Sequence, residues 1–173
     1  MCCICVKTPS GPTVPIVLVA EDEKLIRDRA RRDLDQIHED LGVGYVVVSC
    51  PEEILKMVDL GMLPPNPTAG YLLVTDQQMP PSKKLGHELV LELAHRLQLR
   101  DFRIITGTDR DAKTAMADIL EMNGLRDCHA RILPKSAYAE LGFIIPEMLQ
   151  TTSKREAWVS NSMGLPTLSS QRQ

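Results

Sequence analysis

The stretch that decides the fold is Tyr71-Leu72-Leu73-Val74-Thr75-Asp76, a nearly continuous apolar run that ends in a carboxylate. Parallel strands that are covered on both faces have runs of this kind, whereas half-exposed strands alternate apolar and polar residues. An acid at the carboxyl end of such a strand lies where open α/β sheets place their reactive groups. We therefore predict a buried parallel strand that presents Asp76 at a functional edge of a sheet.

Four other short apolar runs alternate with longer stretches whose apolar residues recur at helical spacing. Five strand-helix units in sequence predict an α/β fold, a doubly wound sandwich. Right-handed crossovers bring the carboxyl ends of all the strands to one edge. The predicted strands cover 15–20, 44–49, 71–75, 102–106 and 130–133, and the predicted helices cover 23–41, 51–60, 85–98, 110–122 and 138–150.

The other segments are irregular. Residues 1–13 contain two prolines and a glycine and are expected to form a flexible leader. The α/β domain is expected to cover residues 14–150, and the polar residues 151–173 to form a tail or linker. The proline-rich residues 63–67 indicate a stiff loop before the central strand. Whether the chain is a stand-alone domain or a piece of a longer protein stays open.

Composition and charge limit the class of protein. Of the 173 residues, 43% are hydrophobic and 25% are charged, as in an ordinary globular domain, and the net charge is −3. A negative net charge argues against a broad grip on nucleic acid, and the arginines of residues 27–35 alternate with acids, as on a solvated helix face. No apolar run approaches the ~20 residues of a membrane helix. We expect a cytoplasmic protein with no membrane contact and no direct nucleic-acid binding.

The five cysteines form no recognisable framework. Cys2 and Cys5 make a C-x-x-C, but no second Cys or His pair lies at zinc-finger spacing. The odd number of cysteines argues against a disulfide scaffold. Free thiols in a reduced N-terminus are the favoured interpretation, with a redox or metal role as the alternative.

Polar side chains close the other predicted strands, as Asp76 closes the central one. Glu21 and Asp22 follow the first strand, Thr106 ends the fourth and Lys135 follows the fifth. Two carboxylates about 5 Å apart repel by roughly 3 kcal/mol at an effective dielectric of ~20, so a cluster of acids favours a bound cation. Hard oxygen ligands suit Mg²⁺, and an ammonium and a hydroxyl complete the groups needed for phosphoryl transfer. An ionised Asp76 could attack phosphorus directly.

Each of these residues alone has a simpler interpretation. Glu21 and Asp22 could cap the helix that follows them, and Asp76 could be a turn residue. Lys135 could be a solvated lysine, and Thr106 a strand residue with high β-propensity. One shared site explains all of them at matching strand ends, whereas the simpler interpretation requires several coincidences.

Four motifs carry a resemblance to a known family: Val19-Ala20-Glu21-Asp22-Glu23, Thr75-Asp76-Gln77-Gln78-Met79-Pro80, Ile104-Ile105-Thr106-Gly107 and Leu133-Pro134-Lys135. In this order they resemble the receiver domain of bacterial two-component response regulators, over residues 15 to about 150. The resemblance implies a flavodoxin-like (βα)5 sandwich whose five-stranded parallel sheet has the order 2-1-3-4-5. It also implies a phosphoprotein that is not an enzyme and that signals by protein contact.

The resemblance further implies roles for the acids. Asp76 would be the phosphoacceptor, and a histidine kinase or histidine phosphotransfer protein would be its phosphodonor. Glu21, Asp22 and Asp76 would bind Mg²⁺ together with the main-chain carbonyl of Gln78. The downstream protein target is not identified by the sequence.

Lys135 would pair with the phosphate and Thr106 would be the switch hydroxyl that turns toward it. Phosphorylation would then shift an equilibrium between two arrangements of the fourth helix and its neighbouring loops. Two positions differ from the family pattern. Ile132 stands where the family has an aromatic residue, and proline precedes Lys135 as Pro134 instead of following it.

Two alternatives remain beside this interpretation. A degenerate receiver would act as an interaction module without being phosphorylated. A haloacid-dehalogenase-like phosphatase would use Asp76 as its nucleophile, but that class has a second aspartate two residues later as its general acid. Gln78 occupies that place and cannot transfer a proton, which disfavours the phosphatase.

Overall fold

The computed structural model of the protein describes residues 4–11, 13–63 and 69–162, with side chains as far as residue 151. Its centre is a six-stranded sheet in the order β1-β3-β2-β4-β5-β6. All neighbouring strands are parallel except β1 and β3, which are antiparallel. The strands are β1 (Cys5–Lys7), β2 (Ile16–Ala20), β3 (Gly44–Val48), β4 (Tyr71–Asp76), β5 (Leu99–Thr106) and β6 (Ile132–Pro134).

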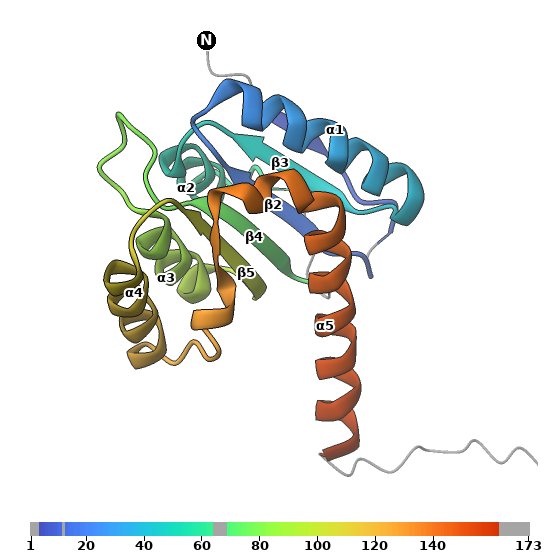
Figure 1. The fold of residues 1–173 in the computed structure, drawn as a ribbon. Coiled ribbons are helices and arrows are strands. Elements are labelled where there is room, and N and C mark those ends of the chain that lie inside the picture. Colours follow the sequence, from blue (N-terminus) through green and yellow to red (C-terminus); the bar gives the residue numbers. More distant parts are fainter. Residues whose placement is uncertain (1–3, 12, 64–68, 163–173) are drawn as a thin grey trace, which may run out of the picture.

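Helices cover both faces of this sheet. α1 and α5 lie on one face, and α2, α3 and α4 lie on the other (Figure 1). No helix in the described part of the chain has the length and apolarity needed to cross a membrane. The α-helices are α1 (Lys24–Leu41), α2 (Pro51–Asp59), α3 (Gly86–Arg96), α4 (Arg110–Met122) and α5 (Leu141–Ser162), and two 3₁₀ helices are η1 (His129–Arg131) and η2 (Lys135–Glu140).

The continuous apolar runs are explained by this double cover. Successive residues of a strand point to opposite faces, so each central strand contributes to two cores. Leu18 and Leu73 pack in the core under α2, α3 and α4, whereas Val19 and Val74 pack in the core under α1 and α5. All four side chains are fully buried. Burial of a side chain of this size stabilises the fold by about 1.5–3 kcal/mol, which favours the doubly wound arrangement predicted from the sequence.

The strand order and register bring the predicted strand ends together. Without β1, the parallel strands have the order β3-β2-β4-β5-β6, which is the predicted order 2-1-3-4-5. Ala20 lies opposite Thr75, Asp76 opposite Ile105, and Thr106 opposite Pro134. The ends of β2, β4, β5 and β6 therefore meet at one edge of the sheet.

β1 differs from the prediction, which had no strand within the leader of residues 1–13. It pairs with the outer edge of β3. Lys7 Nζ lies 3.2 Å from Asp35 Oδ1, and the Tyr45 hydroxyl donates to the same oxygen at 2.6 Å. A strand of three residues has too little pattern to be found by periodicity, and these contacts with a neighbouring strand and helix define it.

α5 is longer than predicted. It continues to Ser162 although a tail or linker was expected from residue 151, and in Figure 1 its second half extends beyond the sheet. Pro146 lies inside the helix. Its missing N–H removes one helical hydrogen bond. The burial of Ile145 and Met148 on either side of Pro146 holds this part of the helix against the sheet.

Some predicted features lie outside the described residues. These are Cys2 of the C-x-x-C, most of the proline-rich loop 63–67, and residues 163–173 of the predicted tail. The cysteines within the described part of the chain are free thiols, namely Cys5, Cys50 and Cys128.

Candidate functional site

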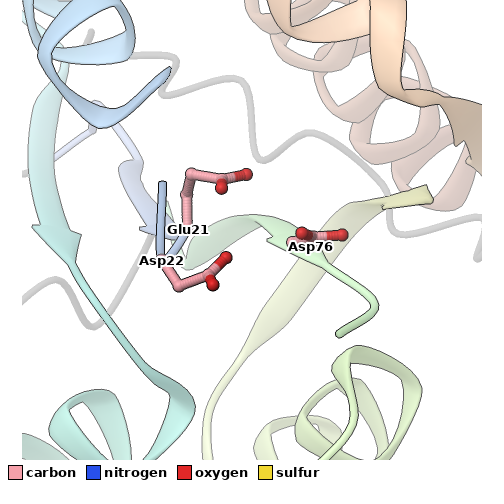
Figure 2. Close-up of side chains that lie close together, drawn as sticks. All are labelled: Glu21, Asp22 and Asp76. Atoms are coloured by element: carbon pink, nitrogen blue, oxygen red, sulfur yellow. The ribbon is translucent and has the colours of Figure 1, made fainter. Parts of the chain in front are cut away.

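Three carboxylates meet where β2 and β4 end. Asp76 is the last residue of β4, and Glu21 and Asp22 follow β2 directly. One oxygen of each carboxylate lies within 4.8 Å of the others. Figure 2 shows the side chains of Glu21 and Asp22 directed toward the side on which Asp76 lies. Parallel pairing of β2 with β4 is what brings these acids together from distant parts of the chain.

Asp76 is held in place by contacts to both of its oxygens. Its side chain is nearly buried, with its residue 2% exposed. The backbone N–H of Gln77 donates to Asp76 Oδ1 at 2.7 Å. The Lys135 ammonium forms an ion pair with Oδ2. Lys135 is the first residue of η2, directly after β6, so the cation comes from a third strand end.

The loop after β2 is held by a cation of α1. Arg27 donates to the main-chain carbonyl of Glu21 at 2.8 Å and also to that of Asp22. Glu21 Oε1 accepts the backbone N–H of Glu23 at 2.9 Å. Arg27, which the sequence analysis placed on a solvated helix face, therefore fixes the backbone that carries two of the acids.

An open pocket of about 500 Å³ lies over these groups. Thr106 lines it and is almost buried, but its hydroxyl is engaged by Thr108: it donates to Thr108 Oγ1 at 3.1 Å and accepts the Thr108 N–H at 3.1 Å. Gln78 also lines the pocket. The full lining is Asp22, Glu23, Asp76, Gln78, Pro80, Thr106, Gly107, Thr108 and Lys135.

The electrostatics of the site are dominated by burial of negative charge. Burial raises the pKa of Asp76, and the bonds from Lys135 and Gln77 offset this only in part. Burial lowers the pKa of Lys135, but its bond to Asp76 and the charge of Glu21 outweigh this effect and raise it. Burial raises the pKa of Glu21 to about 7, against the effect of the Glu23 amide and the Tyr138 hydroxyl. The single ammonium leaves the acids incompletely compensated.

These residues fit a bound Mg²⁺ ion. Glu21 Oε2 is buried and has no hydrogen-bond partner in the described part of the chain. An orphaned carboxylate oxygen beside two further carboxylates is the hard, oxygen-only environment that Mg²⁺ prefers. Glu21, Asp22 and Asp76 are the side chains that would hold the ion, and the main-chain carbonyl of Gln78 remains a predicted fourth ligand.

Several residues around the site were missed by the sequence analysis. Glu23 Oε1 lies 3.4 Å from Lys135 Nζ, so a third acid of the first motif shares the cation. The Gln77 amide Oε1 accepts the His87 N–H at 3.1 Å and its Nε2 lies 2.8 Å from His87 Nδ1, which fixes the start of α3 beside Asp76. No periodicity or spacing marks such contacts, because they join residues of different elements.

Gly86 is needed for this close approach. A Cβ atom at Gly86 would lie 2.3 Å from the main-chain oxygen of Asp76 and 3.1 Å from Gln77 Cα. Both neighbouring atoms are backbone, so neither can move without displacing the loop that follows Asp76. The sequence offered one signal of this, a glycine at the beginning of a predicted helix.

Solved structures resemble this arrangement, although no protein-family model and no curated protein matches the chain. The signal receiver domain of an HD domain-containing protein from Pseudomonas fluorescens has a TM-score of 0.58 and 16% identity, over 83% of this chain and 93% of that one. The receiver domain of the response regulator AraT from Geobacillus stearothermophilus has a TM-score of 0.56 and 20% identity, over 83% and 98%. The chain has the fold of response-regulator receiver domains.

A Francisella response-regulator receiver domain gives the same result. Its TM-score is 0.52 at 21% identity, over 80% of this chain and 98% of that one. Identities this low concern the fold, and the shared fold agrees with the resemblance found in the four sequence motifs. In this fold the end of β4, where Asp76 lies, is at the centre of the edge at which the parallel strands end.

Proposed function

We propose that this chain is a phosphoacceptor receiver in which Asp76 takes a phosphoryl group from a phosphohistidine of a histidine kinase or a histidine phosphotransfer protein. The observation that supports this most is the pairing of Asp76 with Lys135 at an open pocket lined by further acids. A nucleophilic carboxylate, a cation site and an ammonium are the groups that phosphoryl transfer requires. The proposed role is that of a signalling switch and not of an enzyme with turnover.

In the proposed transfer, a carboxylate oxygen of Asp76 forms a bond to phosphorus as the bond between phosphorus and the donor imidazole nitrogen breaks. The nitrogen keeps the electron pair and later takes a proton from water. Bound Mg²⁺ would neutralise charge on the phosphoryl oxygens. The Lys135 ammonium, which is bonded to Asp76 Oδ2 at the pocket, would then bond to a phosphoryl oxygen instead.

The Thr106 hydroxyl offers a route by which the switch could signal. It holds the backbone of Thr108 in this structure, and Asp109 next to it caps α4 by accepting the Ala112 N–H at 2.8 Å. A hydroxyl that turned toward a phosphoryl group on Asp76 would release Thr108. The loop leading into α4 would then be free to change its conformation. This supports a shift between two arrangements of α4 and its loop, one of which a partner protein would recognise.

Phosphorylation with a small-molecule donor tests the proposal. Incubation with labelled acetyl phosphate and Mg²⁺ should give one phosphoryl adduct per chain, and Asp76→Asn should abolish it. Asp59→Asn is the matched control, because Asp59 is an exposed partner of Arg96 that does not belong to the pocket lining. Equal labelling of Asp76→Asn would refute the assignment of Asp76. Absence of any adduct in the wild-type protein would favour an interaction module that works without phosphorylation.

A further inference from the structure

Tyr138 lies behind the cation site and has an unusual environment. It belongs to η2, three residues after Lys135, and is only 3% exposed. Its ring packs in the core under α1 and α5, together with Ala137 and Leu141. Its hydroxyl has no hydrogen-bond partner in the described part of the chain. A buried tyrosine hydroxyl ordinarily has a partner, so this one needs an explanation.

The neighbouring carboxylate has the complementary deficit. Glu21 is fully buried, its Oε1 accepts the Glu23 N–H, and its Oε2 has no hydrogen-bond partner among the described residues. Lys135 Nζ is 4.0 Å from Oε2, which is too far for a hydrogen bond. Both atoms are buried, and the Tyr138 hydroxyl lies near enough to this carboxylate to offset a small part of the rise that burial causes in the pKa of Glu21. A donor without an acceptor thus faces an acceptor without a donor.

We propose that Tyr138 is a positioning residue of the cation site, whose hydroxyl donates to Glu21 Oε2 and holds this carboxylate in place when Mg²⁺ binds. The inference rests on the proposed function, since it assigns a supporting residue to the same site. With Tyr138 on Oε2 and the Glu23 N–H on Oε1, the carboxylate is held on both oxygens. Partners that orient metal-binding carboxylates in this way contribute strongly to metal affinity.

The position of Tyr138 in the chain gives this contact a second consequence. η2 begins with Lys135 and leads directly into α5. Lys135 bonds to Asp76 at one end of η2, and Tyr138 faces Glu21 further along it. The acids that end β4 and follow β2 therefore meet two polar side chains of the same 3₁₀ helix. Cation binding and the conformation of η2 are coupled through this pair of contacts.

Magnesium affinity measured by calorimetry on the full chain tests the inference. Tyr138→Phe keeps the ring and removes only the hydroxyl, and it should weaken Mg²⁺ binding about tenfold. The unfolding midpoint of the Mg²⁺-free variant should not fall, because the hydroxyl that is removed has no partner. Tyr45→Phe is the matched control: its hydroxyl lies in the same core but bonds to Asp35, and its Mg²⁺ affinity should stay within about twofold of the wild type.

Equal Mg²⁺ affinity in Tyr138→Phe and wild type would overturn the inference and leave the proposed function standing. Failure of the wild type to bind Mg²⁺ would overturn both. If Tyr138→Phe did not fold, the near-ultraviolet absorption of tyrosine in the double variant Tyr45→Phe, Tyr71→Phe, which keeps Tyr138 alone of the three tyrosines, would still decide. A Mg²⁺-dependent change there supports the new hydrogen bond, and an unchanged spectrum contradicts it.

Discussion

The Lys135 ammonium is ion-paired with Asp76, a residue 59 positions earlier in the chain. β5 lies between β4, which ends in Asp76, and β6, which directly precedes Lys135, so the contact spans the edge at which these strands end. It joins the predicted phosphoacceptor to η2 and, through η2, to α5. The central acid and the cation are thereby part of one connected unit before any ligand binds.

Loss of the Lys135 charge should destabilise the Mg²⁺-free protein and impair phosphorylation. In Lys135→Met, the clustered carboxylates repel without compensation, and we expect a loss of about 1 kcal/mol in the free energy of unfolding. This loss is small although Asp76 is buried, because the Lys135 side chain is 36% exposed and solvent screens its charge. Urea denaturation in EDTA measures the stability, and acetyl phosphate labelling should fall by about tenfold or more.

Lys84→Met is the matched control for this experiment. Lys84, in the loop before α3, has its Nζ 2.7 Å from Glu92 of that helix, and neither residue belongs to the pocket lining. Its removal should change stability by less than about 0.5 kcal/mol and leave labelling unchanged. Similar losses in both variants would show that Lys135 acts as an ordinary surface charge.

The stability of the Mg²⁺-free protein should fall as the pH rises from about 4.5 to about 7. Burial raises the pKa of Glu21 from 4.5 to about 7, so over this range the folded state holds a proton that the unfolded state has released. The stabilisation is complete below the unfolded-state value and is lost as pH rises through the folded-state value. Its size is on the order of 3 kcal/mol.

Glu21→Gln isolates this contribution. The amide cannot ionise, so its pH profile in urea denaturation with EDTA should be flatter than that of the wild type between pH 5 and 8. Asp76 has a pKa that burial shifts in the same direction, and its share of the slope should remain in the variant. If the stability of Glu21→Gln depended on pH as steeply as that of the wild type, the titrating group would be a residue other than Glu21.

A side chain at Gly86 should displace the loop that follows Asp76. The Cβ of Gly86→Ala would meet the Asp76 carbonyl oxygen at 2.3 Å, and we expect a loss of about 1–3 kcal/mol together with reduced labelling. Gly142→Ala in α5 is the control, since no atom lies within 4 Å of the added Cβ there. That substitution should be neutral or stabilise by up to about 1 kcal/mol. Thermal unfolding of both variants separates a steric conflict from an effect of helix propensity. A steric conflict at Gly86 lowers the stability of that variant alone, whereas helix propensity would raise the stability of both variants.

A buried ion cluster on β5 should matter for stability and not for phosphorylation. Asp101 is 3% exposed, lies 2.9 Å from Arg103 Nη1 and is also ion-paired with Arg131. Asp101→Asn removes the charge that both guanidinium groups share, and we expect a loss of about 3 kcal/mol. Urea denaturation measures it, while the folded variant should still be labelled on Asp76. Asp59→Asn, which affects an exposed pair with Arg96, should cost less than about 1 kcal/mol.

The sequence by itself determined the parallel sheet and the place of its acids. Apolar runs without alternation require cover on both faces, and the run ending in Asp76 is buried along its whole length. Once the strands are parallel and the crossovers right-handed, the residues that end them must meet at one edge. The approach of Glu21, Asp22 and Asp76 follows from that topology and needs no knowledge of side-chain packing.

Only the tertiary structure decided the contacts between elements with no shared pattern. β1 is defined by its pairing with the edge of β3, and the buried Tyr138 of η2 meets the buried Glu21, 117 positions earlier in the chain. Gly86 is required by the Asp76 carbonyl, an atom that local sequence does not place. Periodicity reports which face of an element is buried, but it carries no information about which side chain of another element is opposite. That information arises when the two cores close on the sheet.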